Sequence, residues 1–224
     1  MSYCVAIDGP AGAGKSTIAK QIAKRMNLVY VDTGAMYRAM AVFMLREHVD
    51  PKDTYAISRK CEEAQITIRY ENGEQVVYLN GENVNAFLRT EETGNMASVI
   101  SPCKAVRRKL VRLQHELAET TDVIMDGRDI GTCVLPNADV KIYLTASSRV
   151  RAKRRYDELT AKGETCDLEE IEKDIIERDE RDMTREESPL RQAEDAVLVD
   201  TSNMSIEDVI QTIIAICEEK RRSI

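Results

Sequence analysis

The chain has 224 residues, of which 43% are hydrophobic and 32% charged, enough for one sizeable core with inserted subdomains. A formal net charge of −7 argues against a nucleic-acid partner, because proteins that bind nucleic acid normally present a basic face. The sequence has no apolar run of the ~20 residues that span a membrane, and its first residues lack the pattern of a signal peptide, so we expect a cytoplasmic protein without a membrane partner.

Alternating strands and helices are predicted for the start of the chain. An apolar run over 3–7 predicts a buried strand, and apolar residues between Lys15 and Met26 recur on one face of a helix. A second strand over 28–31 and a helix over about 35–47 follow. Because strands that alternate with helices form parallel sheets with crossover connections, we expect an α/β fold.

The pattern changes to antiparallel structure in the middle of the chain. Apolar and polar residues alternate over 66–70, an Asn-Gly pair follows at 72–73, and a second strand is expected over 75–79. Asn and Gly tolerate the positive φ angles of a type I′ turn, so this order predicts a β-hairpin. A second Asn-Gly pair at 80–81 predicts one more reversal. We interpret about 60–84 as a small insert.

Helical spacing returns further along the chain, from Val106 to Leu117. Three more apolar runs predict core strands over 122–125, 140–144 and 196–199. Together with the two strands near the start of the chain, they predict a parallel sheet of five strands.

Two charged helices and one apolar helix are also expected. The segment from 147 to about 187 is densely charged, and Gly163 divides it into two predicted helices. A capping box in which Asp replaces the usual Glu stands at 205–208. It opens a last helix, whose apolar residues from Ile206 to Cys217 are expected to face the core.

The first chemical motif is a glycine-rich phosphate cradle, which matches G-x-x-x-x-G-K-[ST] over residues 9–16 between a predicted strand and a predicted helix. Its glycines let backbone amides approach an anion closely, and the helix N-terminus adds its dipole. Lys15 supplies a cation for the β- and γ-phosphates of ATP, and Ser16 supplies an oxygen for Mg²⁺. The predicted ATP-binding residues are Gly9, Pro10, Ala11, Gly12, Ala13, Gly14, Lys15, Ser16 and Thr17.

The second motif, Asp-Gly-Arg-Asp at 126–129, ends the third predicted core strand. Ligands bind at the carboxyl ends of strands in such sheets. Asp126 is suited to hold Mg²⁺ through water, Arg128 to neutralise a phosphate and Asp129 to accept hydrogen bonds from a base. The alternative is an ordinary turn, since Asp-Gly is a common turn pair.

Two further segments carry arginines. Thr33 and Arg38 lie at the start of the second predicted helix and suit a second phosphate group; the alternative is a capped helix with its arginine in solvent. Arg178, Arg181 and Arg185 have i, i+3, i+7 spacing, which places three guanidinium groups on one helical face. The alternative there is a solvated helix with self-paired charges.

Four segments occur in the order GPAGAGKST, DTGAMYR, DGRDIGT and ERDERD. Together they resemble bacterial cytidylate kinases, which are nucleoside monophosphate kinases of the P-loop class, and the resemblance covers nearly the whole chain. The second and third segments are far more specific than the first, because the P-loop serves many reactions. The resemblance implies an α/β P-loop NTPase fold, with a five-stranded parallel sheet flanked by helices, a small antiparallel insert and a helical lid.

The resemblance also implies a domain organisation and a reaction. One kinase domain would have its core in 1–59, 105–147 and 188–224, a nucleoside-monophosphate-binding insert over about 60–104 and a lid over about 148–187. It would be a monomer that transfers the γ-phosphate of ATP to CMP or dCMP with Mg²⁺, giving ADP and CDP or dCDP.

The resemblance further implies the roles of individual side chains. The catalytic residues would be Lys15, Arg128, Arg178 and Arg185. The CMP-binding residues would be Thr33, Arg38, Ser98, Arg107, Arg128, Asp129, Arg178, Asp182 and Arg185. Mg²⁺ would be held by Ser16 and, through water, by Asp126.

Two other functions stay open at this point. One is a different small P-loop kinase that acts on UMP or on an acceptor other than a nucleotide. The other is a non-catalytic regulator that binds ATP and uses the charged segment as a partner surface. The antiparallel insert and DGRDIGT favour a nucleotide acceptor, and a pure ATP binder would need no second phosphate site.

Overall fold

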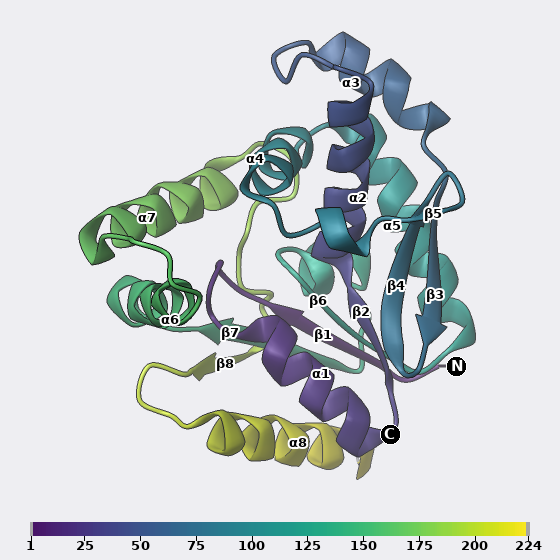
Figure 1. The fold of residues 1–224 in the computed structure, drawn as a ribbon. Helices are drawn as coiled ribbons and strands as arrows, with labels where there is room; N and C mark the ends of the chain where they lie inside the picture. Colours follow the sequence, from purple (N-terminus) through teal and green to yellow (C-terminus); the bar gives the residue numbers. More distant parts are fainter. Residues whose placement is uncertain (1, 223–224) are drawn as a thin grey trace. The chain divides into compact units, whose positions relative to one another are not determined.

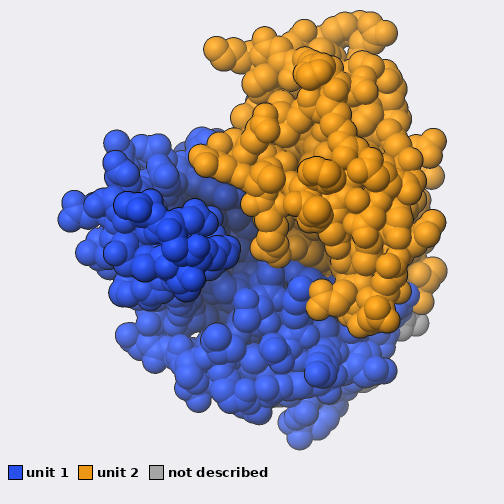
Figure 2. Space-filling model, viewed as in Figure 1, with its two compact units in different colours: residues 1–30, 121–224 blue, residues 31–120 orange. Residues whose placement is uncertain are grey.

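The computed structural model describes residues 2–222 (Figure 1). Two compact units divide the chain, and Figure 2 colours them separately. The first unit comprises the chain up to Tyr30 and from Thr121 onward, and the second comprises Val31–Thr120. Within residues 2–222, no helix is both long and apolar enough to cross a membrane.

The large sheet has five strands in the order β2-β6-β1-β7-β8. β1 pairs in parallel with β6 and β7, and β7 pairs in parallel with β8. The predicted five-stranded parallel sheet is thus confirmed. The strands are β1 Cys4–Asp8, β2 Val29–Asp32, β6 Val123–Gly127, β7 Val140–Thr145 and β8 Val197–Asp200.

The central strand β1 and its neighbour β6 are buried on both faces, which explains their continuous apolar runs. Val5, Ala6 and Ile7 in β1 are fully buried, as is the run Val123–Met125 in β6. Since β1 lies in the middle of the sheet, the loop that follows it starts from a rigid position.

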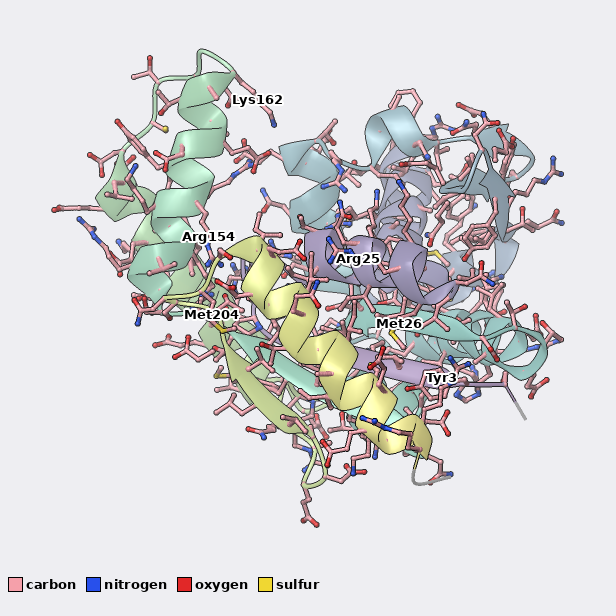
Figure 3. The ribbon with its side chains drawn as sticks, turned by 90° about the horizontal axis from the view of Figure 1, so that it is seen from below. Tyr3, Arg25, Met26, Arg154, Lys162 and Met204 are labelled. Atoms are coloured by element: carbon pink, nitrogen blue, oxygen red, sulfur yellow. The ribbon has the colours of Figure 1, made fainter. Side chains whose placement is uncertain are left out.

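Four long helices belong to the first unit: α1 Lys15–Met26, α6 Ser148–Ala161, α7 Leu168–Thr184 and α8 Ile206–Arg222. α6 and α7 pack against each other, and the expected break between them lies at Gly163, with a φ of +81°. α1 and α8 also pack against each other (Figure 3). Arg25 on α1 donates two hydrogen bonds, of 2.6 and 2.7 Å, to the carboxylate of Glu207 on α8.

The start of α8 corrects one expectation. Ser205 and Asp208 form the predicted capping box, since the Ser205 hydroxyl accepts a hydrogen bond from the Asp208 amide and donates one to its carboxylate. Val209 and Cys217 face the core as expected, but Ile206 is 60% exposed. Met204, just before the helix, packs against the core cluster at this end, so Ile206 stays outside.

The second unit contains a three-stranded antiparallel sheet, in the order β3-β4-β5. Both residues of the first turn, Asn72 and Gly73, have positive φ angles, of 53° and 79°, and so confirm the predicted hairpin. The second reversal, at Asn80 and Gly81, is confirmed in the same way. The strands are β3 Ile66–Glu71, β4 Glu74–Leu79 and β5 Glu82–Asn83.

Four α-helices accompany this sheet: α2 Thr33–Arg46, α3 Thr54–Lys60, α4 Glu91–Ile100 and α5 Lys104–Thr120. Sequence analysis predicted α2 and α5 but not the two shorter helices between them. Both of these begin at side-chain caps, because Asp53 accepts a hydrogen bond from the Ala56 amide and Thr90 accepts one from the Thr93 amide. Their apolar residues are too few to give a clear periodic signal.

The two compact units do not coincide with the divisions expected from the sequence. The second unit extends on both sides of the expected insert at 60–104. The expected lid at 148–187 contains α6 and α7 and lies within the first unit. The division into a core, a nucleotide-binding insert and a lid remains a prediction about the roles of these segments.

Gly9, the residue after β1, provides a test of this packing. Its φ is +149°, and a Cβ atom added there would lie 1.9 Å from the backbone oxygen of Leu144 in β7. We expect Gly9→Ala to lower the free energy of unfolding by at least about 2 kcal/mol, because backbone must shift and strain is added. Urea denaturation measures the change.

Gly94 is the matched control. It lies within α4, and nothing within 4 Å would meet an added Cβ. Gly94→Ala should therefore raise stability by up to about 1 kcal/mol, since alanine loses less backbone entropy in a helix. Equal stability of the Gly9→Ala variant and the parent chain would contradict the packing described at Leu144.

Candidate functional site

The glycine-rich loop between β1 and α1 is held in a conformation that side chains disfavour. Gly9, Gly12 and Gly14 have φ angles of +149°, +74° and +90°. Gly14 is the N-cap of α1 and has no side chain to occupy the amides of the first turn. Those amides and the positive end of the helix dipole suit an anion, as predicted for a phosphate cradle.

The Lys15 side chain is buried beside this loop, with only 6% of the residue exposed. Its Nζ donates a hydrogen bond of 2.8 Å to the backbone oxygen of Pro10. Burial, and then the positive charge of Arg128, lower the pKa of Lys15 to about 7, while Asp126 and Asp8 act in the opposite direction. A phosphate group next to Nζ would favour the charged ammonium.

Ser16 and Asp126, predicted as metal ligands, lie together. The Ser16 hydroxyl donates a 3.0 Å hydrogen bond to Oδ2 of Asp126, and the Tyr30 hydroxyl donates one of 2.7 Å to Oδ1. Hydroxyl and carboxylate oxygens are ligands that Mg²⁺ accepts, and the ion usually keeps several waters and takes phosphate oxygens. The residues therefore fit Mg²⁺. Among residues 2–222, no group of three or more His, Cys, Asp or Glu side chains could hold a metal alone.

Arg128 and Asp129, at the end of β6, reach residues of the expected lid. Nε of Arg128 donates a 2.9 Å hydrogen bond to Oδ2 of Asp182 on α7. Nη2 of Arg185 lies 3.8 Å from Oδ1 of Asp129, and both side chains are less than a tenth exposed. The structure thus brings four of the predicted site residues together within the first unit.

The predicted face of three arginines on α7 is wrong. α7 ends at Thr184, and Arg185 is its C-cap residue in extended backbone, with Nε donating to the Ser188 backbone oxygen. Arg181 is exposed and its Nε donates to the Glu177 backbone oxygen. Arg178 is partly buried, and its charge contributes to lowering the pKa of Lys15. The helix ends before Arg185, which spacing does not reveal, so Arg185 does not share a helical face with the other two arginines.

The other predicted acceptor residues belong to the second unit. Thr33 is the first residue of α2 and is buried, and Arg38 lies further along α2 with Nη1 3.9 Å from Oδ1 of Asp32. Arg107 on α5 is buried, with its guanidinium 5.9 Å from the ring centre of Tyr37. Ser98 on α4 is half-buried. α2 packs against both α4 and α5, so these four residues come from one packed group of helices.

Asp8 is a residue of this region that sequence analysis missed. Its carboxylate accepts hydrogen bonds from the amides of Ile130, at 2.8 Å, and Gly131, at 2.7 Å. It thereby ties the end of β1 to the segment that follows Asp129. Burial raises the pKa of Asp8 to about 6 despite these two hydrogen bonds. The available signal was a carboxylate at the end of an apolar strand, directly before the glycine-rich loop.

Comparison with known proteins covers nearly the whole chain. The family model described as cytidylate kinase matches residues 5–219. A cytidylate kinase from Lactobacillus gasseri is 49% identical over 219 residues, which are 98% of this chain and 95% of that protein. One from Caldicellulosiruptor bescii is 48% identical over 210 residues, 94% of this chain and 93% of that protein. An uncharacterized protein from Eubacterium ventriosum has a similar fold, with a TM-score of 0.52, 12% identity and coverage of 97% and 99%.

The buried carboxyl group of Asp8 predicts a pH effect on stability. Its pKa is raised from 3.8 to about 6, so the folded chain holds a proton that the unfolded chain has lost between these values. The contribution of Asp8 to stability must therefore fall as pH rises through this window. As pH rises from 4 to 7, the free energy of unfolding of the parent chain should fall by up to about 3 kcal/mol relative to that of the Asp8→Asn variant. Urea denaturation of both proteins from pH 4 to 7 measures this difference, and a difference that rises with pH would contradict it.

Proposed function

The chain belongs to the cytidylate kinase family, and we propose that it transfers the γ-phosphate of ATP to CMP or dCMP, giving ADP and CDP or dCDP. The observation that carries this proposal is the identity of nearly half of all aligned residues to cytidylate kinases over almost the full length of both proteins. The phosphate cradle with a buried lysine supports it from the structure.

The glycine-rich loop is proposed to bind the phosphates of ATP. Its backbone amides and the start of α1 supply hydrogen bonds and a positive dipole, and Lys15 supplies a positive charge once a neighbouring phosphate favours its ammonium form. Because Lys15 is buried, its attraction to phosphate is only weakly screened by water. Mg²⁺, proposed to be held by Ser16 and, through water, by Asp126, would neutralise phosphate charge when bound.

The residues proposed to bind the nucleotide acceptor are those that the sequence motifs indicate. The proposed residues are Arg128, Asp129, Arg178, Asp182 and Arg185 in the first unit, and Thr33, Arg38, Ser98 and Arg107 in the second. The guanidinium groups of Arg38, Arg128, Arg178 and Arg185 would bind phosphate oxygens in bidentate fashion. Asp129, Ser98 and Arg107 would bind the base. Asp182, which now accepts from Arg128, would bind the ribose.

The proposed chemistry depends on position and charge. ATP and CMP are both anions, so the enzyme must offset their repulsion and hold the acceptor oxygen in line with the γ-phosphorus. An acceptor phosphate is already largely ionised at neutral pH, so no dedicated general base is required. Lys15 and the arginines at 128, 178 and 185 would stabilise the charge on the transferring group. A monomeric state and a cytoplasmic location are also predictions.

Lys15→Ala and Arg185→Ala test the assigned roles. Each change removes a buried charge proposed to stabilise the transferring phosphoryl group, so kcat should fall on the order of 10³-fold or more. ADP release at saturating ATP and CMP measures it.

Two exposed residues provide matched controls. Lys24, in the last turn of α1, and Arg112 on α5 are solvent-exposed, and their alanine variants should keep kcat within about twofold, as surface changes rarely matter. A Lys15→Ala enzyme that turns over at a rate close to that of the parent would refute the role of this lysine.

A substrate panel separates the proposed activity from the alternatives. We expect ADP release with CMP and dCMP at least about tenfold faster than with UMP or AMP, because a site that hydrogen-bonds one base leaves polar groups unpaired with another. Preference for UMP or for an acceptor outside the panel would indicate a different P-loop kinase. ATP binding without ADP release from any monophosphate would indicate a regulator.

A further inference from the structure

Arg151 on α6 connects three separate parts of the first unit through one guanidinium group. Its Nε donates a 2.9 Å hydrogen bond to the backbone oxygen of Ala146, just after β7, and its Nη1 donates one of 3.0 Å to the backbone oxygen of Ala11. Its Nη2 lies 2.6 Å from Oδ2 of Asp179 on α7. The side chain is only 6% exposed, so these contacts are made away from water.

The contact with Ala11 bears on the phosphate cradle. A trans peptide directs its carbonyl oxygen and its N–H to opposite sides. While Arg151 holds the Ala11 oxygen, the amide of Gly12 must point away from Arg151. If this peptide rotated, a carbonyl oxygen would replace an N–H on the side available to an anion. Gly12, with a φ of +74°, tolerates such rotation better than other residues do.

Packing strengthens this restraint. A Cβ atom at Gly12 would lie 3.3 Å from Cβ of Arg151 and 3.8 Å from its Cγ, so the stem of Arg151 covers one face of the loop. The arginine therefore contacts the loop through both its apolar stem and its charged end.

Asp179 compensates the buried charge of Arg151. It is only 8% exposed, and its second oxygen, Oδ1, has no hydrogen-bond partner among residues 2–222. A buried ion pair of this kind contributes little net stability, but removing one partner is costly because the other charge is left alone. The same residue joins Arg151 to the helix that also carries Arg178 and Asp182.

We propose that Arg151 is a positioning residue for the nucleotide donor, which holds the Ala11 carbonyl away from the bound phosphates and couples the phosphate loop to α7 through Asp179. This inference rests on the proposed binding of ATP by the loop but not on the identity of the acceptor. It predicts that losing Arg151 weakens ATP binding specifically, while a purely structural role would weaken ATP and CMP binding together.

Arg151→Met keeps the stem and removes the three donors. We expect its Kd for ATP, measured by calorimetry, to rise at least tenfold, and its Kd for CMP to stay within twofold of the parent value. Arg155→Met is the matched control, because Arg155 is on the same helix but is half-exposed and pairs with Glu158 at 3.1 Å. It should leave both constants unchanged. Arg151→Lys should be intermediate, since an ammonium lacks the planar fork that spans three acceptors.

A double variant separates positioning from folding. Arg151→Met alone leaves Asp179 buried without a counter-charge, so its unfolding midpoint in urea should fall. Arg151→Met/Asp179→Leu removes that charge and should regain most of the midpoint. If the double variant still binds ATP weakly, Arg151 positions the loop. If ATP affinity returns with stability, or if CMP binding falls equally in Arg151→Met, the proposal is overturned.

The proposed kinase activity can fail independently of this inference. ADP release by the parent chain with CMP tests the activity, while the ATP constants of the variants test Arg151. A parent chain without CMP-dependent ADP release would remove the proposed function and leave the positioning role standing.

Discussion

A buried ammonium group needs compensating charge and hydrogen bonds close by, and the arrangement around Lys15 meets this requirement. Its Nζ has one backbone acceptor in Pro10, while Asp8 and Asp126 favour its charge and Arg128 and burial oppose it. The balance of these effects leaves the pKa of Lys15 at about 7. A polyanion entering the loop would tip that balance, and this explains why a phosphate cradle can keep its cation inside the protein.

Buried charge is concentrated around the same end of the parallel sheet. Asp8 and Asp126 lie at the carboxyl ends of β1 and β6, Asp129 follows β6, and all three are nearly fully buried. Each carboxylate has a partner in the local structure: Asp8 accepts hydrogen bonds from backbone amides, Asp126 accepts them from hydroxyls and Asp129 faces Arg185. Charges in this position cost desolvation energy, and the chain accepts that cost where anions are proposed to bind.

The sequence predicted the elements whose signals are local. The apolar runs of the five strands, the Asn-Gly turns of the hairpin and the glycine-rich loop depend on neighbouring residues, and all were placed correctly. Contacts between distant segments could not be predicted, because spacing says nothing about which helix end meets which strand. Arg185 left the face of Arg178 since α7 ends before it, and Asp8 and Arg151 act through backbone groups far along the chain. The substrate roles of the site residues remain predictions.

The pairing of Arg25 with Glu207 has a mechanical consequence. α1 begins at the end of the glycine-rich loop, and its last turn is joined to α8 by an ion pair with two hydrogen bonds. Ile18 and Ile22 of α1 are buried in the same core cluster as Val209 of α8. A helix held in this way along its length should move little when a ligand binds at its first turn. α6 and α7, whose residues are mostly exposed, are less firmly embedded in the apolar interior and are the segments in which an adjustment to a bound ligand is expected.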